Sequence, residues 1–283
     1  MPLQLLMQMI RPLTSAITIP FLPVMSPRST AMTFGFALAF IFASGPAQTL
    51  PGTPAVLRPD TVATIGNVTV TRWHSPRMTV VEVPDTLVFW YRPHNDAPLD
   101  SVARREDFRC LINGSFFDGA RGDAGHAGWL SQYGLRISPL RDDRQLTHIV
   151  RCNGTTRIVE FLSARSFETS GDHALLEFQT GPLIIDGGDI RADLIQSSIN
   201  GPTRHTRSLL ATLDRHRCFL ITVTEQVRLF DLAATVQRLS IFQNGRLDVI
   251  NLDGGSSVAL FLRDVHDANY NVDDRLPILI GFH

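Results

Sequence analysis

A chain of 283 residues, 44% of them hydrophobic and 19% charged, has the composition of a globular protein with a substantial core. Its length suits one large domain or two small ones. Its formal net charge of −1 lacks the basic bias of proteins that bind nucleic acids or coat acidic membranes, so we expect neither partner.

The N-terminus has the layout of a secretory signal. The apolar run 31–43 follows Arg28 and precedes the small residues Ser44, Gly45 and Ala47. This run is shorter than a comfortable membrane span. We predict a signal peptide over residues 1–47, so that the body of the protein is secreted or periplasmic and has no membrane contact after cleavage. An uncleaved anchor is the alternative, and it would also leave the body outside the cytoplasm.

The remaining chain is predicted to form one β-rich domain over residues 61–283, after a Pro-rich lead-in at 48–60. Strands are expected at 62–73, 78–83, 87–91, 110–112, 134–138, 148–152, 157–162, 174–178, 182–186, 207–213, 217–223 and 276–281. Helices are expected at 98–108 and 229–242, and irregular loops at 119–133 and 191–206. Many short strands with few helices predict an α+β fold with a mixed or largely antiparallel sheet and a few packed helices.

Three cysteines, Cys110, Cys152 and Cys218, each lie in an apolar run. In an exported protein two of them could pair and leave one over, and their spacing does not say which. The sequence contains no Cys-x-x-Cys or His-x-x-x-His pair, so we expect no structural zinc site and no metal in the functional site. We expect no cofactor either.

One Gly-Gly corner combines several polar groups. Residues two apart in a strand share a face, so Asn251 and Asp253 should point to the same side. Gly254 and Gly255 permit positive φ and let a ligand approach the backbone, and Ser256 adds a hydroxyl. An Asp-Gly turn between apolar runs is also typical of a plain hairpin, which is the alternative.

Other predicted strand ends carry comparable polar residues. Asn113, Ser115 and Asp118 follow one strand, Gln179 and Asp186 flank another, and Arg207 begins a third. Asp186 is also followed by two glycines, so a plain hairpin is an alternative there too. If these ends converge, they form a pocket of carboxylates, amides and a guanidinium, which suits a sugar joined to phosphate.

The residues resemble a known family through several ordered motifs. These motifs are Ile112-Asn113-Gly114-Ser115-Phe116-Phe117-Asp118, Gly134-Leu135-Arg136-Ile137, Gln179-Thr180-Gly181-Pro182-Leu183-Ile184, Arg207 at a strand start, and Asn251-Leu252-Asp253-Gly254-Gly255-Ser256-Ser257. Together they are similar to the phosphodiester glycosidase family over about residues 75–283. The resemblance implies a β-rich α+β fold and hydrolysis of a sugar-1-phosphodiester. It points to the site residues Asn113, Asp118, Asp186, Arg207, Asn251, Asp253 and the turn Gly254–Ser257.

Chemistry assigns roles within this set. A departing phosphate is a stable anion near neutral pH, since its second pKa is about 6, so proton donation to the leaving oxygen matters less than in ordinary glycosidases. We expect Arg207 to hold the phosphate, Asp253 to serve the anomeric carbon or its attacking water, and Asp186 to be the second carboxylate. Asn113 and Asn251 would then bind sugar hydroxyls.

The expected function is an exported hydrolase that cleaves the glycosidic bond of a sugar-1-phosphodiester, with a small-molecule or polysaccharide glycan as substrate. A second hypothesis is a non-catalytic module that binds envelope polysaccharide or phosphodiester-linked glycans. A third is a structural envelope protein in which the Asp-Gly corners are turns and nothing more.

Overall fold

The computed structural model describes residues 55–65, 68–74, 76–83, 88–91, 97–118, 125–153, 158–167 and 174–282. All of them belong to one compact unit, Gly52–His283. The predicted signal peptide, 1–47, lies outside the described residues. In the described part of the chain, no helix is long and apolar enough to cross a membrane.

The largest sheet has eight strands in the order β1-β2-β3-β16-β15-β17-β13-β14. In chain order these strands are β1 (Thr61–Ile65), β2 (Val68–His74), β3 (Arg77–Val83), β13 (Leu183–Asp186), β14 (Asp189–Ile190), β15 (His205–Leu213), β16 (Arg217–Val227) and β17 (Leu247–Asn251). Its two longest strands, β15 and β16, lie in the middle of the sheet, and residues 207–213 and 218–223 are continuously buried because both faces are covered there.

Two smaller sheets and a short ribbon complete the fold. The five-stranded sheet runs β11 (Val159–Ser163), β10 (His148–Asn153), β12 (Ala174–Thr180), β8 (Leu130–Gln132) and β9 (Leu135–Ser138). The four-stranded sheet runs β18 (Leu260–Leu262), β5 (Cys110–Asn113), β19 (Ile278–Phe282) and β4 (Val88–Tyr91). The ribbon pairs β6 (Phe117–Asp118) with β7 (Gly125–His126).

Between these named strands of the described chain, every pairing is antiparallel. The protein is therefore β-rich and antiparallel, as the sequence pattern predicts.

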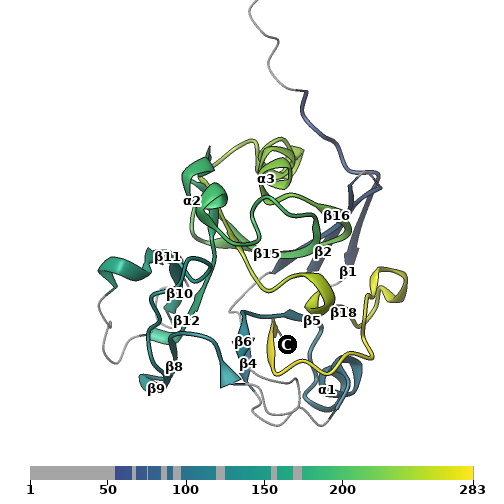
Figure 1. Cartoon of the computed structure of the whole chain (residues 1–283). Helices are drawn as coiled ribbons and strands as arrows, with labels where there is room; N and C mark the ends of the chain where they lie inside the picture. Colours follow the sequence, from purple (N-terminus) through teal and green to yellow (C-terminus); the bar gives the residue numbers. More distant parts are fainter. Residues whose placement is uncertain are drawn as a thin grey trace, which may run out of the picture. The chain divides into compact units, whose positions relative to one another are not determined.

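Three hydrophobic clusters hold the sheets and helices together. One face of the large sheet, with Leu210 and Ile250, packs against the two smaller sheets. Its other face, with Leu209 and Val249, is covered by the helices α2 (Ala192–Ser197) and α3 (Leu229–Gln237), as Figure 1 shows. A third cluster joins α1 (Leu99–Arg105) to the outer face of the four-stranded sheet. Alternate residues of one strand thus enter different cores, which fixes its register.

Several local predictions were wrong. The predicted loop 119–133 includes β7 and β8, and the predicted loop 191–206 includes α2. The predicted helix at 229–242 ends as α3 at Gln237, because Leu239 is extended (ψ 133°) and forms a parallel bridge with Leu57. A short 3₁₀ turn, Ser240–Phe242, follows.

The three cysteines are free and buried in the structure. All three belong to the cluster beneath the large sheet. Burial raises the pKa of the Cys218 thiol to about 12, because a thiolate is poorly solvated in an apolar core.

Candidate functional site

The two Asp-Gly-Gly corners have different structures. At the first corner, Asp186 pairs with Asp189 across a two-residue hairpin, and both central glycines have positive φ, 61° at Gly187 and 95° at Gly188. This is the geometry of a type I′ turn, which explains why glycine occupies both positions. The hairpin alternative therefore describes this corner.

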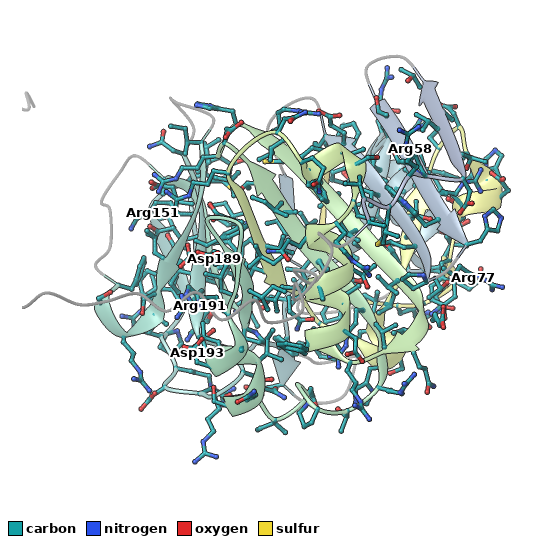
Figure 2. All side chains as sticks on the ribbon, turned by 90° about the horizontal axis from the view of Figure 1, so that it is seen from above. Arg58, Arg77, Arg151, Asp189, Arg191 and Asp193 are labelled. Atoms are coloured by element: carbon teal, nitrogen blue, oxygen red, sulfur yellow. The ribbon has the colours of Figure 1, made fainter. Side chains whose placement is uncertain are left out.

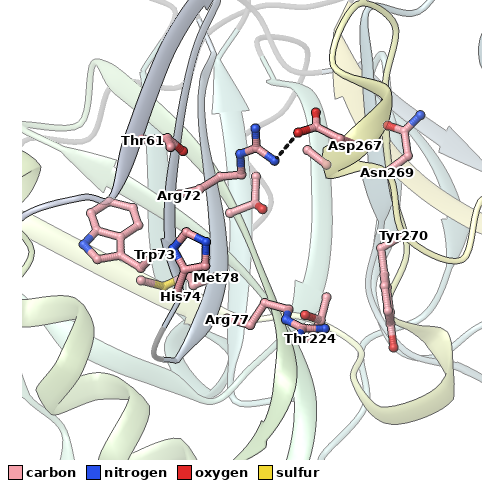
Figure 3. Close-up of a pocket in the computed structure, with 12 residues that line it drawn as sticks. Thr61, Arg72, Trp73, His74, Arg77, Met78, Thr224, Asp267, Asn269 and Tyr270 are labelled. Atoms are coloured by element: carbon pink, nitrogen blue, oxygen red, sulfur yellow. Dashed lines mark hydrogen bonds and ion pairs between the residues drawn. The ribbon is translucent and has the colours of Figure 1, made fainter.

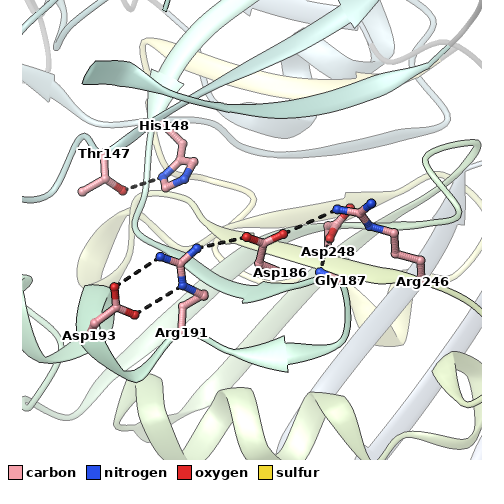
Figure 4. A network of polar contacts seen from close by, with 8 residues as sticks. All are labelled: Thr147, His148, Asp186, Gly187, Arg191, Asp193, Arg246 and Asp248. Atoms are coloured by element: carbon pink, nitrogen blue, oxygen red, sulfur yellow. Dashed lines mark hydrogen bonds and ion pairs between the residues drawn. The ribbon is translucent and has the colours of Figure 1, made fainter. Parts of the chain in front are cut away.

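Asp186 is held in a surface ion-pair network (Figure 4). Its carboxylate lies 3.0 Å from Arg191 and 3.6 Å from Arg246. Asp248, the neighbour of Asp186 across the strand pair, accepts a 2.5 Å hydrogen bond from the Gly187 amide and so fastens the hairpin to β17. The charge of Asp186 is therefore balanced by ordinary ion pairs with Arg191 and Arg246.

Sheet register separates Asp186 from Asp253. Ile185 pairs with Val249, so Asp186 lies beside the beginning of β17, whereas Asp253 follows its end. Five residues of extended chain between Asp248 and Asp253 span about 16 Å. The expected meeting of Asp186 with Asp253 in one site is therefore wrong.

The second corner, at Asp253, is not a hairpin. Gly254 is extended (φ −132°, ψ −166°), Gly255 has φ 64°, and a 3₁₀ turn, Gly255–Ser257, follows. The chain then leaves the large sheet, and β18 pairs with β5 of the four-stranded sheet. No returning strand closes this turn, and a Cβ atom added to Gly255 would meet nothing within 4 Å.

Asn113, at the end of β5, holds this corner in place through hydrogen bonds. Its amide nitrogen donates to the Asp253 carbonyl at 2.8 Å, and its side-chain oxygen accepts from the Ser208 hydroxyl at 2.6 Å and the Ala259 amide at 3.2 Å. The Asp253 amide in turn donates to the Gly114 carbonyl at 3.1 Å. Both polar atoms of the Asn113 side chain are engaged in hydrogen bonds within the protein, so it holds the corner and does not, as expected from the sequence, bind a sugar hydroxyl.

Arg207 lies directly beside the corner. A Cβ atom on Gly254 would stand 3.7 Å from Arg207 Cδ and 3.9 Å from its Nη1. The adjacent Thr206 donates its hydroxyl to the Gly255 carbonyl at 2.7 Å, which ties β15 to the turn. Arg207 thus lies beside Gly254, the residue that follows Asp253 in the chain.

The Arg207 guanidinium is buried, and the part of the chain that the structure describes supplies no counter-ion for it. It is 2% exposed, and its Nη2 donates to the carbonyls of Asn200 and Thr203 at 2.8 and 2.9 Å. Among the described residues no carboxylate pairs with it, and its buried Nε has no partner. Burial lowers the pKa of Arg207 to about 10, which still leaves it charged at neutral pH.

Asn251 shares a sheet face with Arg207. It pairs with Leu209 on β15, and Arg207 is two residues away along that strand, so the two are diagonal neighbours. The Asn251 amide nitrogen donates to the Gly181 carbonyl at 3.1 Å, while its buried oxygen has no partner among the described residues. An orphan acceptor therefore lies on the same face as the orphan donor of Arg207.

The other predicted polar residues serve different contacts. Gln179 uses both side-chain groups on the backbone of Trp129, Arg141 and Leu146, and it is fully buried. The Ser115 hydroxyl donates to the Gln179 carbonyl at 2.6 Å. Asp118 is exposed and forms an ion pair with Arg141. Ser256 is exposed on the 3₁₀ turn.

Sequence reasoning missed Ser208 and Thr206. Both side chains lie on the strand face opposite Arg207, and together they connect β15 to Asn113 and to Gly255. The available signal was their alternation with Arg207 at the start of an apolar strand. Buried hydroxyls at those positions do not add to apolar packing, so each needs a hydrogen-bond partner.

Within the described ranges, no group of three His, Cys, Asp or Glu side chains is placed to hold a metal ion. A cavity of about 440 Å³ opens between β2, β3 and the segment 267–270 (Figure 3). It shares no lining residue with the predicted site.

These features define a β-rich domain with a buried cation at a glycine corner, and comparison with known proteins gives its class. The sequence profile of the phosphodiester glycosidase family matches residues 107–280. The chain belongs to this family. A comparison with curated protein sequences found no match.

Solved structures share the fold at low sequence identity. The zebrafish N-acetylglucosamine-1-phosphodiester alpha-N-acetylglucosaminidase catalytic domain, auto-inhibited by its pro-peptide, matches with a TM-score of 0.56 at 15% identity, covering 76% of this chain and 77% of that one. A Synechocystis protein of unassigned function matches at 0.50 and 14%, covering 78% and 63%. A Burkholderia pseudomallei K96243 protein assigned as exported matches at 0.50 and 10%, covering 76% and 74%.

Proposed function

We propose that this protein is an exported hydrolase that cleaves the glycosidic bond between a sugar and phosphate in a sugar-1-phosphodiester. Membership of the phosphodiester glycosidase family supports the reaction class. The observation that carries the proposal is Arg207, a buried guanidinium with no carboxylate partner among the described residues, packed against Gly254 beside Asp253.

Arg207 supplies the cation that the leaving group needs. Burying a charge without a counter-ion costs several kcal/mol, so such a charge usually has a ligand or a functional role. A guanidinium matches the geometry of phosphate oxygens. Its neighbour Gly254 has no side chain, so an anion at the corner can approach both the backbone and Arg207.

Asp253 supplies the carboxylate at the anomeric carbon. When the C1–O bond breaks, its electron pair leaves with the phosphate monoester, whose second pKa is about 6, so no strong acid is required. Asp253 then acts on the sugar side, either as the nucleophile or as the base that takes a proton from the attacking water. Asn251, whose side-chain oxygen has no partner in the described ranges, contacts a sugar hydroxyl, and Asn113 holds the Asp253 backbone in place.

The two Asp-Gly-Gly corners offer a matched test. Asp253→Asn keeps the size of the side chain and removes its charge, so we expect turnover of a chromogenic sugar-1-phosphodiester to fall by at least about 100-fold. Asp186→Asn makes the same change in the same local sequence, within the surface network, and should leave turnover within about twofold.

Activity of Asp253→Asn within twofold of wild type would remove Asp253 from the mechanism. Calorimetric binding of the same substrate by a wild-type protein that shows no turnover would replace the hydrolase with the non-catalytic glycan-binding module.

A further inference from the structure

The loop that follows α2 closes around the Arg207 guanidinium. Nη2 of Arg207 carries two N–H groups, and it donates to two carbonyls of this loop, those of Asn200 at 2.8 Å and Thr203 at 2.9 Å. Carbonyl oxygens carry a partial negative charge, so they solvate the buried cation without cancelling its charge. Residues 198–204, which we call the Arg207 loop, therefore stabilise the cation and leave its charge available to an anion.

This anchoring also decides the direction of Nη1. A guanidinium is planar, so fixing Nη2 on two acceptors fixes where Nη1 points. Nη1 lies on the side of the glycine corner, 3.9 Å from the position that a Cβ atom on Gly254 would occupy. A shift of the two carbonyls would therefore turn Nη1 away from an anion bound at this corner.

Gly201 sets the position of the Arg207 loop against α2. It is buried, and a Cβ atom added to it would overlap the Ile195 carbonyl oxygen and stand 2.8 Å from the Ser198 Oγ. The Ser198 hydroxyl donates to the same carbonyl at 3.1 Å, and Ile195 belongs to the core under the helices. These atoms have no room to move aside, so only glycine lets the loop lie this close to the helix.

The helix α2 is itself fixed at its start. Arg191, the residue before α2, donates its amide to the Ile184 carbonyl of β13 at 2.9 Å. Its guanidinium lies 3.0 Å from Asp186 and 3.2 Å from Asp193, and Figure 2 shows Arg191 beside Asp193. Because α2 is tied to the sheet through both backbone and side chain, it gives the Arg207 loop a fixed support.

Thr203 connects the two carbonyls to each other. Its hydroxyl donates to the Asn200 carbonyl at 3.1 Å, so the oxygen that accepts from Arg207 also accepts from Thr203. The side chain of Thr203 is exposed, so it adds little to the core. Removing this hydroxyl therefore loosens an acceptor of Arg207 and spares the packing of the fold.

We propose that Gly201 and Thr203 are positioning residues, which hold Arg207 so that Nη1 points at the phosphate of the substrate. The inference rests on the proposed function, because a phosphate at the corner is what gives this direction a role. The diester carries one negative charge, and the departing monoester gains a second as it takes the electron pair of the C1–O bond. A well-aimed cation therefore stabilises the transition state more than the bound substrate, so misdirecting it lowers kcat more than it raises KM.

Steady-state kinetics on a chromogenic sugar-1-phosphodiester tests both residues. We expect kcat to fall by at least about tenfold in Gly201→Ala and about threefold in Thr203→Val, with KM within about twofold of wild type. Thr203→Ser keeps the hydroxyl and should keep the wild-type kcat.

Ser197→Ala is the matched control for Thr203→Val. Ser197 is exposed on α2, and its hydroxyl donates to the carbonyl three residues earlier, that of Leu194, at 3.1 Å. Thr203 makes the same local contact, but the oxygen that it binds also holds Arg207. Ser197→Ala should therefore leave kcat and KM unchanged.

The Arg207→Met background separates positioning from a general structural effect. If Thr203 acts through Arg207, adding Thr203→Val to Arg207→Met should lower kcat by less than about 1.5-fold. A threefold loss in both backgrounds, or wild-type kcat in Thr203→Val, would overturn the proposal. Thermal unfolding checks that each variant is folded in the assay, and if Gly201→Ala does not fold, Thr203→Val decides.

Failure of the loop and failure of the hydrolase give different results. If the wild type turns over the substrate and Thr203→Val does so equally well, the loop proposal fails and the hydrolase stands. If the wild type turns over nothing, the hydrolase fails, and calorimetry with inorganic phosphate tests the loop. Binding that weakens by at least about threefold in Thr203→Val and not in Ser197→Ala supports the loop, whereas no binding, or equal binding by the two variants, overturns it.

Discussion

Asn113→Ala tests how the corner at Asp253 is held. Truncation removes the donor to the Asp253 carbonyl and leaves two buried groups, the Ser208 hydroxyl and the Ala259 amide, without their acceptor. Each buried polar group that loses its partner costs about 1–3 kcal/mol. We therefore expect the free energy of unfolding to fall by about 3–5 kcal/mol.

Urea unfolding measures this loss as a fall in the midpoint of roughly 1–2 M at an unchanged slope. Asn244→Ala, an exposed control, should change the free energy of unfolding by less than about 0.5 kcal/mol. Ser208→Ala should cost about 1 kcal/mol, since Asn113 keeps its bond from Ala259.

The double variant of Asn113→Ala and Ser208→Ala distinguishes a structural role of Asn113 from a contact with the substrate. If Asn113 and Ser208 act through their shared hydrogen bond, their combined loss will fall short of the sum by about 1 kcal/mol. A loss below about 1 kcal/mol for Asn113→Ala, accompanied by a large drop in turnover, would mean that Asn113 contacts substrate and that the positioning argument is wrong.

Three further predictions concern the two corners and the charges around them. Gly187→Ala places alanine at φ 61° with no contact shorter than 3.6 Å, so thermal unfolding should shift down by the equivalent of about 1–2 kcal/mol with turnover unchanged. Gly254→Ala has an ordinary φ but puts a Cβ atom 3.0 Å from the Thr206 carbonyl and 3.7 Å from Arg207, so its main effect should be a loss of turnover and not of stability. A loss of turnover in Gly187→Ala together with a purely structural loss in Gly254→Ala would contradict the site. Arg207→Met should change stability by less than about 2 kcal/mol, because an unpaired buried charge is costly to keep, while turnover falls by at least about 100-fold; full turnover would exclude the phosphate role. Burial lowers the pKa of His148 to about 4, so the folded state disfavours its proton, and the contribution of His148 to stability should be complete above pH 6.5 and fall between pH 6.5 and 4, by about 2 kcal/mol at pH 5. Burial lowers the pKa of His126 to about 4 as well, so His126 adds a similar loss over the same range, which remains in His148→Gln. In urea unfolding across this range, His148→Gln should flatten the pH dependence and the exposed His216→Gln should not; identical profiles for His148→Gln and wild type would contradict this assignment.

Much of the fold could be predicted because the central strands carry their own signal. Leu209 and Leu210 enter cores on opposite faces of the large sheet, so the middle of β15, residues 209–211, is apolar on both sides and stands out in the sequence. The helix α2 could not be predicted in the same way. It has six residues and buries one of them, Ile195, fully, which is too short a pattern to show helical periodicity.

Some residues of the candidate site could be proposed from the sequence, but which of them lie together could not. Arg207 and Asp253 converge because β15 and β17 are neighbours in register, and the sequence contains no local record of which strands pair. Asp186 belongs to a strand next to β17 as well, but the antiparallel direction carries it to the other end. The order and the directions of the strands decide which carboxylate lies near Arg207, and both are properties of the whole sheet.

The contrast between the corners comes from where the chain goes next. After Gly188 the short β14 returns along β13, which closes the turn and leaves Asp186 to surface arginines. After Gly255 the chain must deliver Leu260 and Phe261 to two different cores, and it can do so only by leaving the large sheet and pairing with β5. The turn at Asp253 therefore stays open, held by Asn113 and Thr206 and not by a returning strand. An open glycine corner beside a buried guanidinium is a place where an anion can bind, and a closed hairpin on the surface is not.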